Sequence, residues 1–309
     1  MTGQWPFDSS STADQVLAGK DLTGQVVVIT GANSGIGYET ARSLAAARAT
    51  VIMACREVET GRLAKLKIEA AHPGSDVECH EVNLASLASI QSFCDELDHD
   101  QVTTVICNAG VICPDYEETD DGFEYTWGVS HAGHFFLVQQ LLPKLLATPK
   151  SRVIMLSSES HRSPARLDFE SLPYRRQNYS VMKAYGQAKL CNALMAVELD
   201  RRYSSRGLMA CFVHPGTLVT TDIGRKSAVF RLIMRLARPF TKTPAQGAAT
   251  SVFCASWNPY EQLAGRYFSH CQPARPSEEA TDPAIASRLW DFTDQLLKKA
   301  IRQNERVRA

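Results

Sequence analysis

Tyr185 and Lys189 are spaced as an acid–base pair in this 309-residue sequence. They stand four residues apart in a stretch of helical character, which places both on one face of a helix, one turn apart. A phenol has a pKa near ~10, too high for acid–base work at neutral pH, and a nearby ammonium lowers that pKa by favouring the phenolate. The pair therefore predicts general acid–base catalysis on a substrate oxygen, with Tyr185 exchanging the proton.

Two adjacent serines, Ser157 and Ser158, precede this pair along the chain. A serine hydroxyl can donate a hydrogen bond to the oxygen on which Tyr185 acts, and so hold the substrate in place. Residue type and position suit both serines, so at this point the two remain rivals for the role.

A glycine-rich turn lies far upstream, where Gly31, Gly35 and Gly37 follow an apolar β-branched run and open a helical stretch. Glycines at such a turn let the backbone approach a pyrophosphate, and the helix N-terminus adds N–H donors and the positive end of its dipole. The spacing is GxxxGxG, not the commoner GxGxxG. Together with the acid–base pair, the turn predicts hydride transfer between a nicotinamide cofactor and an alcohol or carbonyl.

The choice between the two nicotinamide cofactors is predicted by the end of the second apolar run. Arg56 stands there, and no acid ends the run. A carboxylate at this position would bind the ribose 2′-OH of NAD, whereas an arginine suits the 2′-phosphate of NADP. Glu57 follows directly and competes with this interpretation. We expect NADP(H) to be preferred, with NAD(H) as the alternative.

Taken in order, these motifs resemble the short-chain dehydrogenase/reductase superfamily over about residues 21–275. The resemblance implies that Ser158, Tyr185 and Lys189 are catalytic and that Lys189 also binds the nicotinamide ribose. It implies a cofactor site formed by the glycine turn, the second and third strands, an Asn-Ala-Gly motif, the Tyr-Lys pair and a Pro-Gly motif. These cofactor-binding residues are Gly31, Asn33, Ser34, Gly35, Ile36, Gly37, Arg56, Asn83, Leu84, Asn108, Ala109, Gly110, Tyr185, Lys189, Pro215, Gly216 and Thr220.

Within the superfamily the sequence is most similar to the retinol-dehydrogenase-like branch. The resemblance rests on residues 157–162, 189–192 and 246–250. This branch usually has a long insert between the catalytic serine and tyrosine, and alignment to it favours Ser158 over Ser157. Some of its members also carry WW domains, which need two spaced tryptophans; the leader offers only Trp5, so we expect none here.

Ser130 departs from the family pattern, in which a helix asparagine holds a water in the proton relay to the lysine. A serine hydroxyl is shorter than a carboxamide and should hold this water less well. We count Ser130 as the fourth member of the catalytic set. Its identity leaves a second function open, that of a cofactor-binding regulatory or scaffold protein with weak or no turnover. Asn83, where the family usually has aspartate, is a milder departure.

Residues 225–240 combine arginines at helical spacing with a large apolar surface. In the resembled family this segment forms the substrate lid, so its apolar content predicts a small lipophilic substrate such as a retinoid, a steroid or a fatty carbonyl. The arginines also suit shallow peripheral contact with a membrane. The sequence does not distinguish between a lid packed on its own domain and a membrane contact.

The elements that must position these residues alternate between strand and helix about seven times, which predicts an α/β fold. The fold class is a single Rossmann-type, doubly wound parallel sheet of about seven strands with helices on both faces. Strands are predicted at 25–30, 50–54, 76–84, 103–107, 152–156, 208–213 and 265–268, and helices at 38–47, 57–71, 86–98, 123–146 and 180–203. We expect residues 1–24 to form a loosely held leader arm and 25–309 the dehydrogenase domain.

Composition and charge are those of an ordinary globular protein, with 44% hydrophobic residues and a formal net charge of zero. Nothing in them favours nucleic acid as a partner. Nine cysteines without metal-ligand spacing predict reduced thiols, no metal site and a cytoplasmic location, with membrane association as an alternative. We expect His131 and His134 to be packed or hydrogen-bonded, and basic residues near the C-terminus to end a solvated helix. The family uses the helices at 123–146 and 180–203 for subunit contacts, so a homo-oligomer is also open.

Overall fold

The computed structural model describes residues 5–216 and 242–308. This part of the chain forms one sheet in the order β3-β2-β1-β4-β5-β6-β7-β8. All neighbouring strands are parallel except β8, which pairs antiparallel with β7. The strands are β1 (Val26–Thr30), β2 (Thr50–Cys55), β3 (Val77–Glu81), β4 (Thr104–Cys107), β5 (Ser151–Leu156), β6 (Leu208–His214), β7 (Tyr267–Ser269) and β8 (Gln272–Pro273). The doubly wound parallel sheet is confirmed, with one short edge strand more than the seven predicted.

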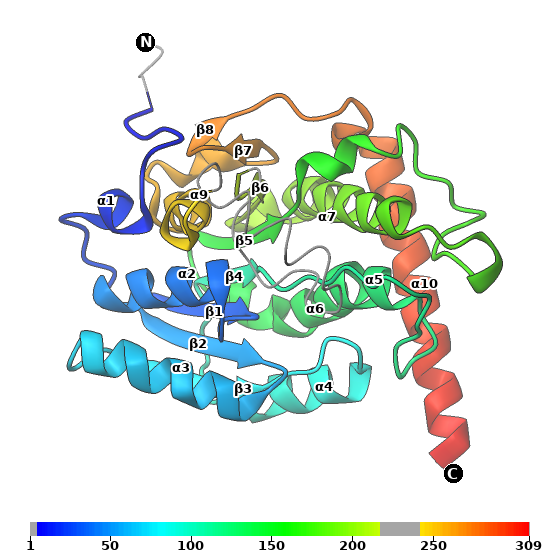
Figure 1. Ribbon diagram of the computed structural model, residues 1–309, viewed down its shortest axis with the longest axis horizontal. Helices are drawn as coiled ribbons and strands as arrows, with labels where there is room; N and C mark the ends of the chain where they lie inside the picture. Colours follow the sequence, from blue (N-terminus) through cyan, green and yellow to red (C-terminus); the bar gives the residue numbers. More distant parts are fainter. Residues whose placement is uncertain (1–4, 217–241, 309) are drawn as a thin grey trace.

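Helices cover both faces of the sheet, as Figure 1 shows. One face carries α1 (Ala13–Leu17), α2 (Gly35–Ala46), α3 (Val58–Ala71) and α9 (Pro244–Ser256). The other carries α4 (Leu87–Glu96), α5 (Tyr125–Trp127), α6 (Gly133–Leu146), α7 (Val181–Tyr203) and α10 (Pro283–Arg308). Each face buries its own cluster of apolar side chains, which is why the strands themselves read as almost continuous apolar runs.

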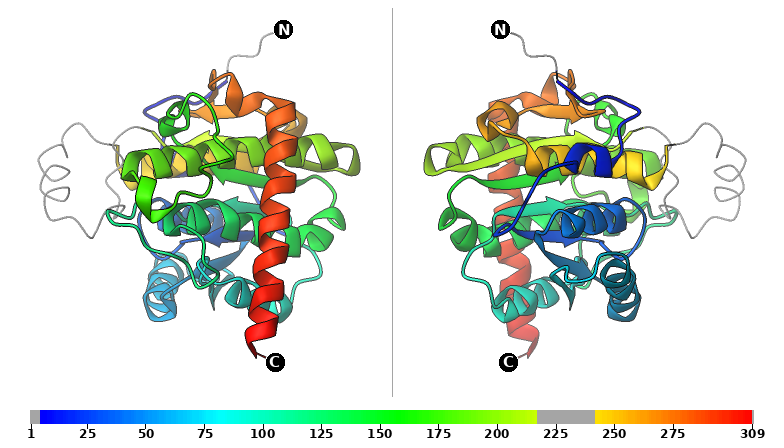
Figure 2. Two further views of the ribbon diagram at one scale, coloured as in Figure 1. Left: turned by 90° about the vertical axis from the view of Figure 1, so that its right-hand side faces the viewer. Right: turned by 90° about the vertical axis from the view of Figure 1, so that its left-hand side faces the viewer.

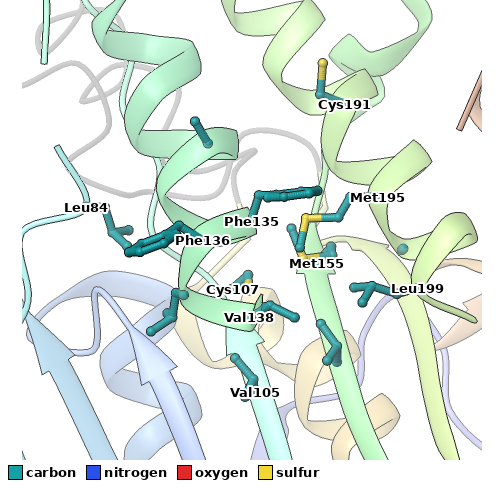
Figure 3. Packing of buried hydrophobic residues seen from close by; sticks show 14 of the residues in the cluster. Leu84, Val105, Cys107, Phe135, Phe136, Val138, Met155, Cys191, Met195 and Leu199 are labelled. Carbon is teal, nitrogen blue, oxygen red and sulfur yellow. The ribbon is translucent and has the colours of Figure 1, made fainter. Parts of the chain in front are cut away.

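The cluster between α6, α7 and the central strands fixes the height of α7 above the sheet. Side chains from both helices interdigitate over β4 and β5 (Figure 3). The labelled members are Leu84, Val105, Cys107, Phe135, Phe136, Val138, Met155, Cys191, Met195 and Leu199. Because such a core is close-packed, it sets the positions of the polar residues near the start of α7.

The helix predicted at 123–146 is interrupted next to the sheet. A π-helical turn, η1 (Gly128–Ala132), separates α5 from α6, and the Gly133 N–H donates to the Gly128 carbonyl across it. At Gly133 the helix backbone passes so near the segment after β3 that a Cβ there would lie 2.4 Å from the Leu84 oxygen. Such π turns are rare and are frequent at functional sites. This one carries Ser130 and His131.

The leader is not loosely held over the part that the structure describes. Val16 in α1 is buried, and α1 packs against α2 and α9. Further upstream, the Trp5 ring lies 4.9 Å from Trp257 and 5.6 Å from Phe253, by centroids. The expectation of a loose arm was therefore wrong, because the aromatic side of α9 offers it a surface on which to pack.

The C-terminal helix is longer and more buried than a solvated helix end. α10 runs from Pro283 to Arg308 and lies across α7 (Figure 2). Its buried side chains include Leu289, Trp290 and Leu297. Its far end, where Lys298 and Lys299 are exposed, is the solvated helix end that was predicted.

Two predictions fall on residues that the structure does not describe. Thr220, predicted to bind the cofactor, and the segment 225–240, predicted to form a lid or a membrane contact, both lie outside the described ranges.

Across the described helices, none has the length and apolar character needed to cross a bilayer.

Candidate active site

A cavity of about 400 Å³ lies at the carboxyl ends of β1, β2, β4 and β5. The strand order reverses between β1 and β4, and open α/β sheets bind their ligands at such a point. The predicted residues that line the cavity are Gly31, Asn33, Ser34, Gly35, Ile36, Gly37, Arg56, Asn83, Leu84, Asn108, Ala109, Gly110, Tyr185, Lys189 and Pro215. Ser130, Ser158 and Gly216 are not among its lining residues.

The glycine turn joins β1 to α2 with a backbone that only glycine adopts readily. Gly31 and Gly35 have φ values of +65° and +57°. At Gly37 a Cβ would lie 2.2 Å from the Gly31 carbonyl oxygen, so a larger residue would push the helix off the turn. The first N–H groups of α2 therefore border the cavity with nothing bulky before them. This arrangement fits a pyrophosphate.

Asn108 stabilises the glycine turn through hydrogen bonds to the end of β1. Its Nδ2 donates to the Thr30 carbonyl at 2.8 Å, so the amide ties the end of β4 to the end of β1. The Thr30 hydroxyl accepts from the backbone N–H groups of Asn108 and Ala109, both at 3.0 Å. The Asn-Ala-Gly motif thus shapes the cavity floor through backbone contacts.

His134 extends this network to the π turn, a role that was not predicted from the sequence. Its Nδ1 donates to the Ser130 carbonyl at 2.9 Å, so its Nε2 must accept from the Thr30 hydroxyl at 2.8 Å. Burial lowers the pKa of His134 to about 4, which keeps the ring neutral. His134 is thus a hydrogen-bonded core histidine, as predicted. Its link to Thr30 became visible only when the two segments were brought together.

The predicted acid–base pair projects from the first turns of α7. Lys189 Nζ lies 5.5 Å from the centroid of the Tyr185 ring. Both side chains line the cavity and are more than nine-tenths buried. α7 can pack closely against the loop that follows β5 because Gly186 has no side chain. A Cβ at Gly186 would lie 1.7 Å from the Ser163 carbonyl oxygen. Gly186 therefore sets the contact between Tyr185 and the loop that carries Ser158.

The structure separates the two rival serines. The Ser157 hydroxyl donates to the Lys189 carbonyl at 2.8 Å, so it is used inside the fold although the residue borders the cavity. The Ser158 hydroxyl accepts from the Ser160 N–H at 3.2 Å, and hydrogen bonding by the Ser158 side chain acts to lower the pKa of the Tyr185 phenol. His161 fixes Ser158 by donating from Nδ1 to its carbonyl. Ser158 therefore stays the predicted catalytic serine.

The pKa of Tyr185 is not lowered in the structure, contrary to the expectation from its lysine. Burial raises it above the ordinary value of a phenol, and the hydrogen bond from Ser158 opposes only part of that rise. Burial also lowers the pKa of Lys189 to about 8. The direction was wrong because spacing along a helix says nothing of desolvation, which here acts on both groups and favours their neutral forms.

Ser130 lies at the back of the site. It is fully buried, and its hydroxyl accepts from the Val111 N–H at 3.4 Å. A Cβ at Gly110 would lie 3.7 Å from this hydroxyl and 3.2 Å from Lys189 Nζ. Ser130 and Lys189 therefore face each other across Gly110.

Arg56 borders the opposite end of the cavity. It follows β2 directly, and more than half of its side chain is exposed. Its guanidinium donates to the Tyr125 hydroxyl at 3.2 Å and pairs with Glu57 at 3.3 Å. Glu57 therefore contacts Arg56, but the guanidinium of Arg56 still lies at the rim of the cavity. Tyr125 was not predicted, because it comes from a distant segment.

Comparison with known proteins identifies the family. A model of the short chain dehydrogenase family matches residues 25–168. The chain is 42% identical to the WW domain-containing oxidoreductase of Homo sapiens over 303 residues, which are 96% of this chain and 73% of that protein. The chain belongs to the short-chain dehydrogenase family. This confirms the resemblance on which the site was predicted, and the chemistry of the family is oxidation and reduction between alcohols and carbonyls.

Two other similar proteins support the assignment. Retinol dehydrogenase 11 of Mus musculus is 41% identical over 278 residues, which are 89% of this chain and 87% of that one. A crystal structure of an uncharacterized protein from Mycobacterium Paratuberculosis superimposes with a TM-score of 0.75 at 34% identity, covering 93% of this chain and 97% of the other. The short-chain dehydrogenase fold thus extends over nearly the whole chain.

Proposed function

We propose that this short-chain dehydrogenase is an NADP(H)-dependent oxidoreductase that interconverts a lipophilic alcohol and its carbonyl. The observation that carries the proposal is the meeting of Tyr185, Lys189 and the glycine turn in one cavity, with Ser158 beside Tyr185. The preference for NADP(H) is supported by Arg56, which extends along the rim with no acid at the end of β2.

The residues present fit a nicotinamide dinucleotide. The glycine cradle and the start of α2 would hold its pyrophosphate, Arg56 its 2′-phosphate, and Lys189 its nicotinamide ribose. When bound, the cofactor supplies or accepts the hydride at the substrate carbon. Ser158 Oγ would hold the substrate oxygen, and Tyr185 Oη would give or take the proton there. Holding these groups together accounts for the rest of the rate enhancement.

A lipophilic substrate is supported by apolar residues in the lining of the cavity. Val111, Ile112, Val129 and Leu156 line it and offer apolar surface. Apolar walls with few polar groups are typical of sites for hydrophobic small molecules. The similarity to proteins named retinol dehydrogenase agrees with this class. We include retinoids, steroids and fatty carbonyls in the proposal.

Ser130 supports a second candidate function, that of a cofactor-binding protein with weak turnover. Its hydroxyl already pairs with the Val111 N–H and has less reach toward Lys189 than a carboxamide would have. The glycine turn and Arg56 do not depend on Ser130, so cofactor binding would persist where turnover fails.

The decisive experiment combines a substrate screen with Tyr185→Phe. NADPH oxidation is followed against panels of retinal, steroid and aliphatic carbonyls, and NADPH affinity is measured by nicotinamide fluorescence. The variant keeps the ring and lacks the proton-carrying hydroxyl, so turnover should fall by about 10²-fold or more with NADPH affinity unchanged. Tyr203→Phe, at the far end of α7, is the matched control. If Tyr185→Phe retains most of the activity, Tyr185 is not the acid–base group.

A further inference from the structure

The side-chain amide of Asn192 donates to the same backbone carbonyl as the proposed catalytic lysine, Lys189. Lys189 Nζ donates to the Leu156 carbonyl at 3.0 Å, and Asn192 Nδ2 donates to the same oxygen at 3.1 Å. Lys189 and Asn192 are three residues apart on α7 and therefore lie on one face. A carbonyl oxygen has two lone pairs, so these two donors together saturate it.

The other end of the Asn192 amide is held by a histidine. His131 Nδ1 lies 3.3 Å from Asn192 Oδ1, and His131 Nε2 lies 3.3 Å from the Thr293 hydroxyl. All three side chains are fully buried. The chain of bonds links α10 to α7 through the π turn.

Hydrogen-bond chemistry fixes the direction of every bond in this chain. An amide oxygen only accepts, so His131 Nδ1 carries the proton and Nε2 must accept from Thr293. Burial lowers the pKa of His131 to about 3, so the ring has one proton to place. With the Asn192 amide reversed, its oxygen would face the Leu156 carbonyl, which has no proton to donate. The arrangement therefore has a single consistent orientation.

We propose that Asn192 is a positioning residue for Lys189, held in place by the buried chain that starts at Thr293. By occupying one lone pair of the Leu156 carbonyl, Asn192 confines Nζ to the other. The remaining N–H groups of Lys189 then point to the cavity, where the proposed function needs them for the nicotinamide ribose. The consequence for the cofactor rests on that proposed function.

Removal of Asn192 should change the charge state of Lys189 in a predictable direction. With no competing donor, the whole carbonyl is free to stabilise the ammonium, so the pKa of Lys189 should rise. The other titratable groups around Lys189 are Cys107 on β4, His134 on α6 and Tyr185 on α7. Burial raises the pKa of Cys107 and of Tyr185 and lowers that of His134 to about 4. All three are therefore neutral from about pH 6 to about pH 9, where Lys189 titrates.

The test measures the pKa of Lys189 directly in the cofactor-free protein. Lysine labelled with ¹³C at Cε is titrated by NMR, and the Lys189 signal is assigned through its loss in Lys189→Arg. Asn192→Leu removes both hydrogen bonds at nearly constant volume. It should raise the pKa of Lys189 by about half a unit or more and weaken NADPH binding about three- to tenfold. Thr293→Val, at the far end of the chain, should shift both quantities in the same direction by less.

Thr148→Val is the matched control, because Thr148 is also buried and its hydroxyl bonds only the Lys144 carbonyl on α6. It should lower the melting temperature without moving the pKa of Lys189. If Asn192→Leu and Thr293→Val behave as this control does, Asn192 is merely structural and the inference is wrong. Should Asn192→Leu not fold, Thr293→Val decides alone. A protein that binds neither NADPH nor NADH would refute the proposed function, and the NMR titration would still decide on Asn192.

Discussion

Arg56 is held at the rim of the cavity by the Tyr125 hydroxyl, so its guanidinium is directed before any ligand arrives. Ser130 and Lys189 face each other across Gly110 at the other end of the site. At the scale of single residues, Arg56 bears on which cofactor binds, and Ser130 bears on the rate of turnover.

Arg56→Ala should weaken NADPH binding and leave NADH binding nearly unchanged. A charge-assisted bond to the 2′-phosphate is worth roughly 1.5–3 kcal/mol, about a ten- to hundredfold change in Kd. Fluorescence titration with both nucleotides measures it. Arg62→Ala is the control, since Arg62 is equally exposed and pairs only with Glu59 on α3. Equal loss for both nucleotides would show that Arg56 does not recognise the phosphate.

Ser130→Asn should raise kcat and leave cofactor affinity unchanged, if the missing carboxamide limits proton relay. The larger side chain must fit beside Val111 and Gly110, and overpacking could cost about 1–3 kcal/mol of stability. Steady-state kinetics with the best substrate of the screen measure the effect. Brisk and equal kcat values in both forms would show that the asparagine is dispensable here. No turnover in either form, with NADPH still bound, would favour the regulatory function.

At the scale of elements, the π turn between α5 and α6 has the largest consequences. It carries His131, which bonds to α7 and α10, and its Ser130 carbonyl accepts a hydrogen bond from His134 at the start of α6, which also bonds to the cavity floor. Regular helix there would place these rings on other faces. The turn therefore joins the floor of the cavity, α7 and α10.

The two histidines predict a loss of stability in mild acid. Burial lowers the pKa of His131 to about 3 and that of His134 to about 4. In the unfolded chain a histidine titrates near ~6.5, so between about pH 6.5 and pH 4 the unfolded chain binds more protons and stability falls as the pH falls. Each histidine should remove about 1–2 kcal/mol by pH 5.

Urea unfolding at pH 7.5, 6 and 5 measures this loss. His134→Gln should lower stability at pH 7.5 and flatten its dependence on pH. Thr148→Val, a buried substitution without a titratable group, should lower stability and leave its dependence on pH unchanged. Parallel slopes for the wild type and His134→Gln would rule out His134 as a source of the acid sensitivity.

At the scale of the whole molecule, α10 completes the face that α7 begins. The Trp290 ring packs 4.7 Å from the Phe135 ring by centroids, and the Arg202 guanidinium lies 4.7 Å from the Trp290 ring. α10 lies across α7, one of the two helices that the family resemblance associates with subunit contacts (Figure 2). An oligomer built through that side would have to accommodate α10.

Trp290→Ala should lower the free energy of unfolding by about 3–5 kcal/mol, the usual cost of emptying a buried aromatic site. Chemical denaturation followed by circular dichroism measures it. Met182→Ala is the control, because the Met182 side chain is exposed and its loss should change stability by less than about 0.5 kcal/mol. A similar midpoint for both variants would mean that α10 adds little to the fold.

Local sequence patterns were enough to predict the order of the elements and the residues proposed for the chemistry. Short β-branched runs between helical stretches specify a doubly wound parallel sheet, because the period of each apolar pattern reports local backbone conformation. The glycine turn and the Tyr185–Lys189 pair were equally visible, since each motif lies within eight residues of chain. Local patterns of this kind need no knowledge of distant contacts.

Features that depend on neighbours far along the chain became visible in the folded structure alone. It assigned the Ser157 hydroxyl to the Lys189 carbonyl, placed Tyr125 against Arg56, and linked Thr293 to the lysine through His131. It also reversed the expected direction for the pKa of Tyr185. Burial, desolvation and hydrogen-bond partners depend on which distant segments pack together, and no spacing along the chain encodes that packing.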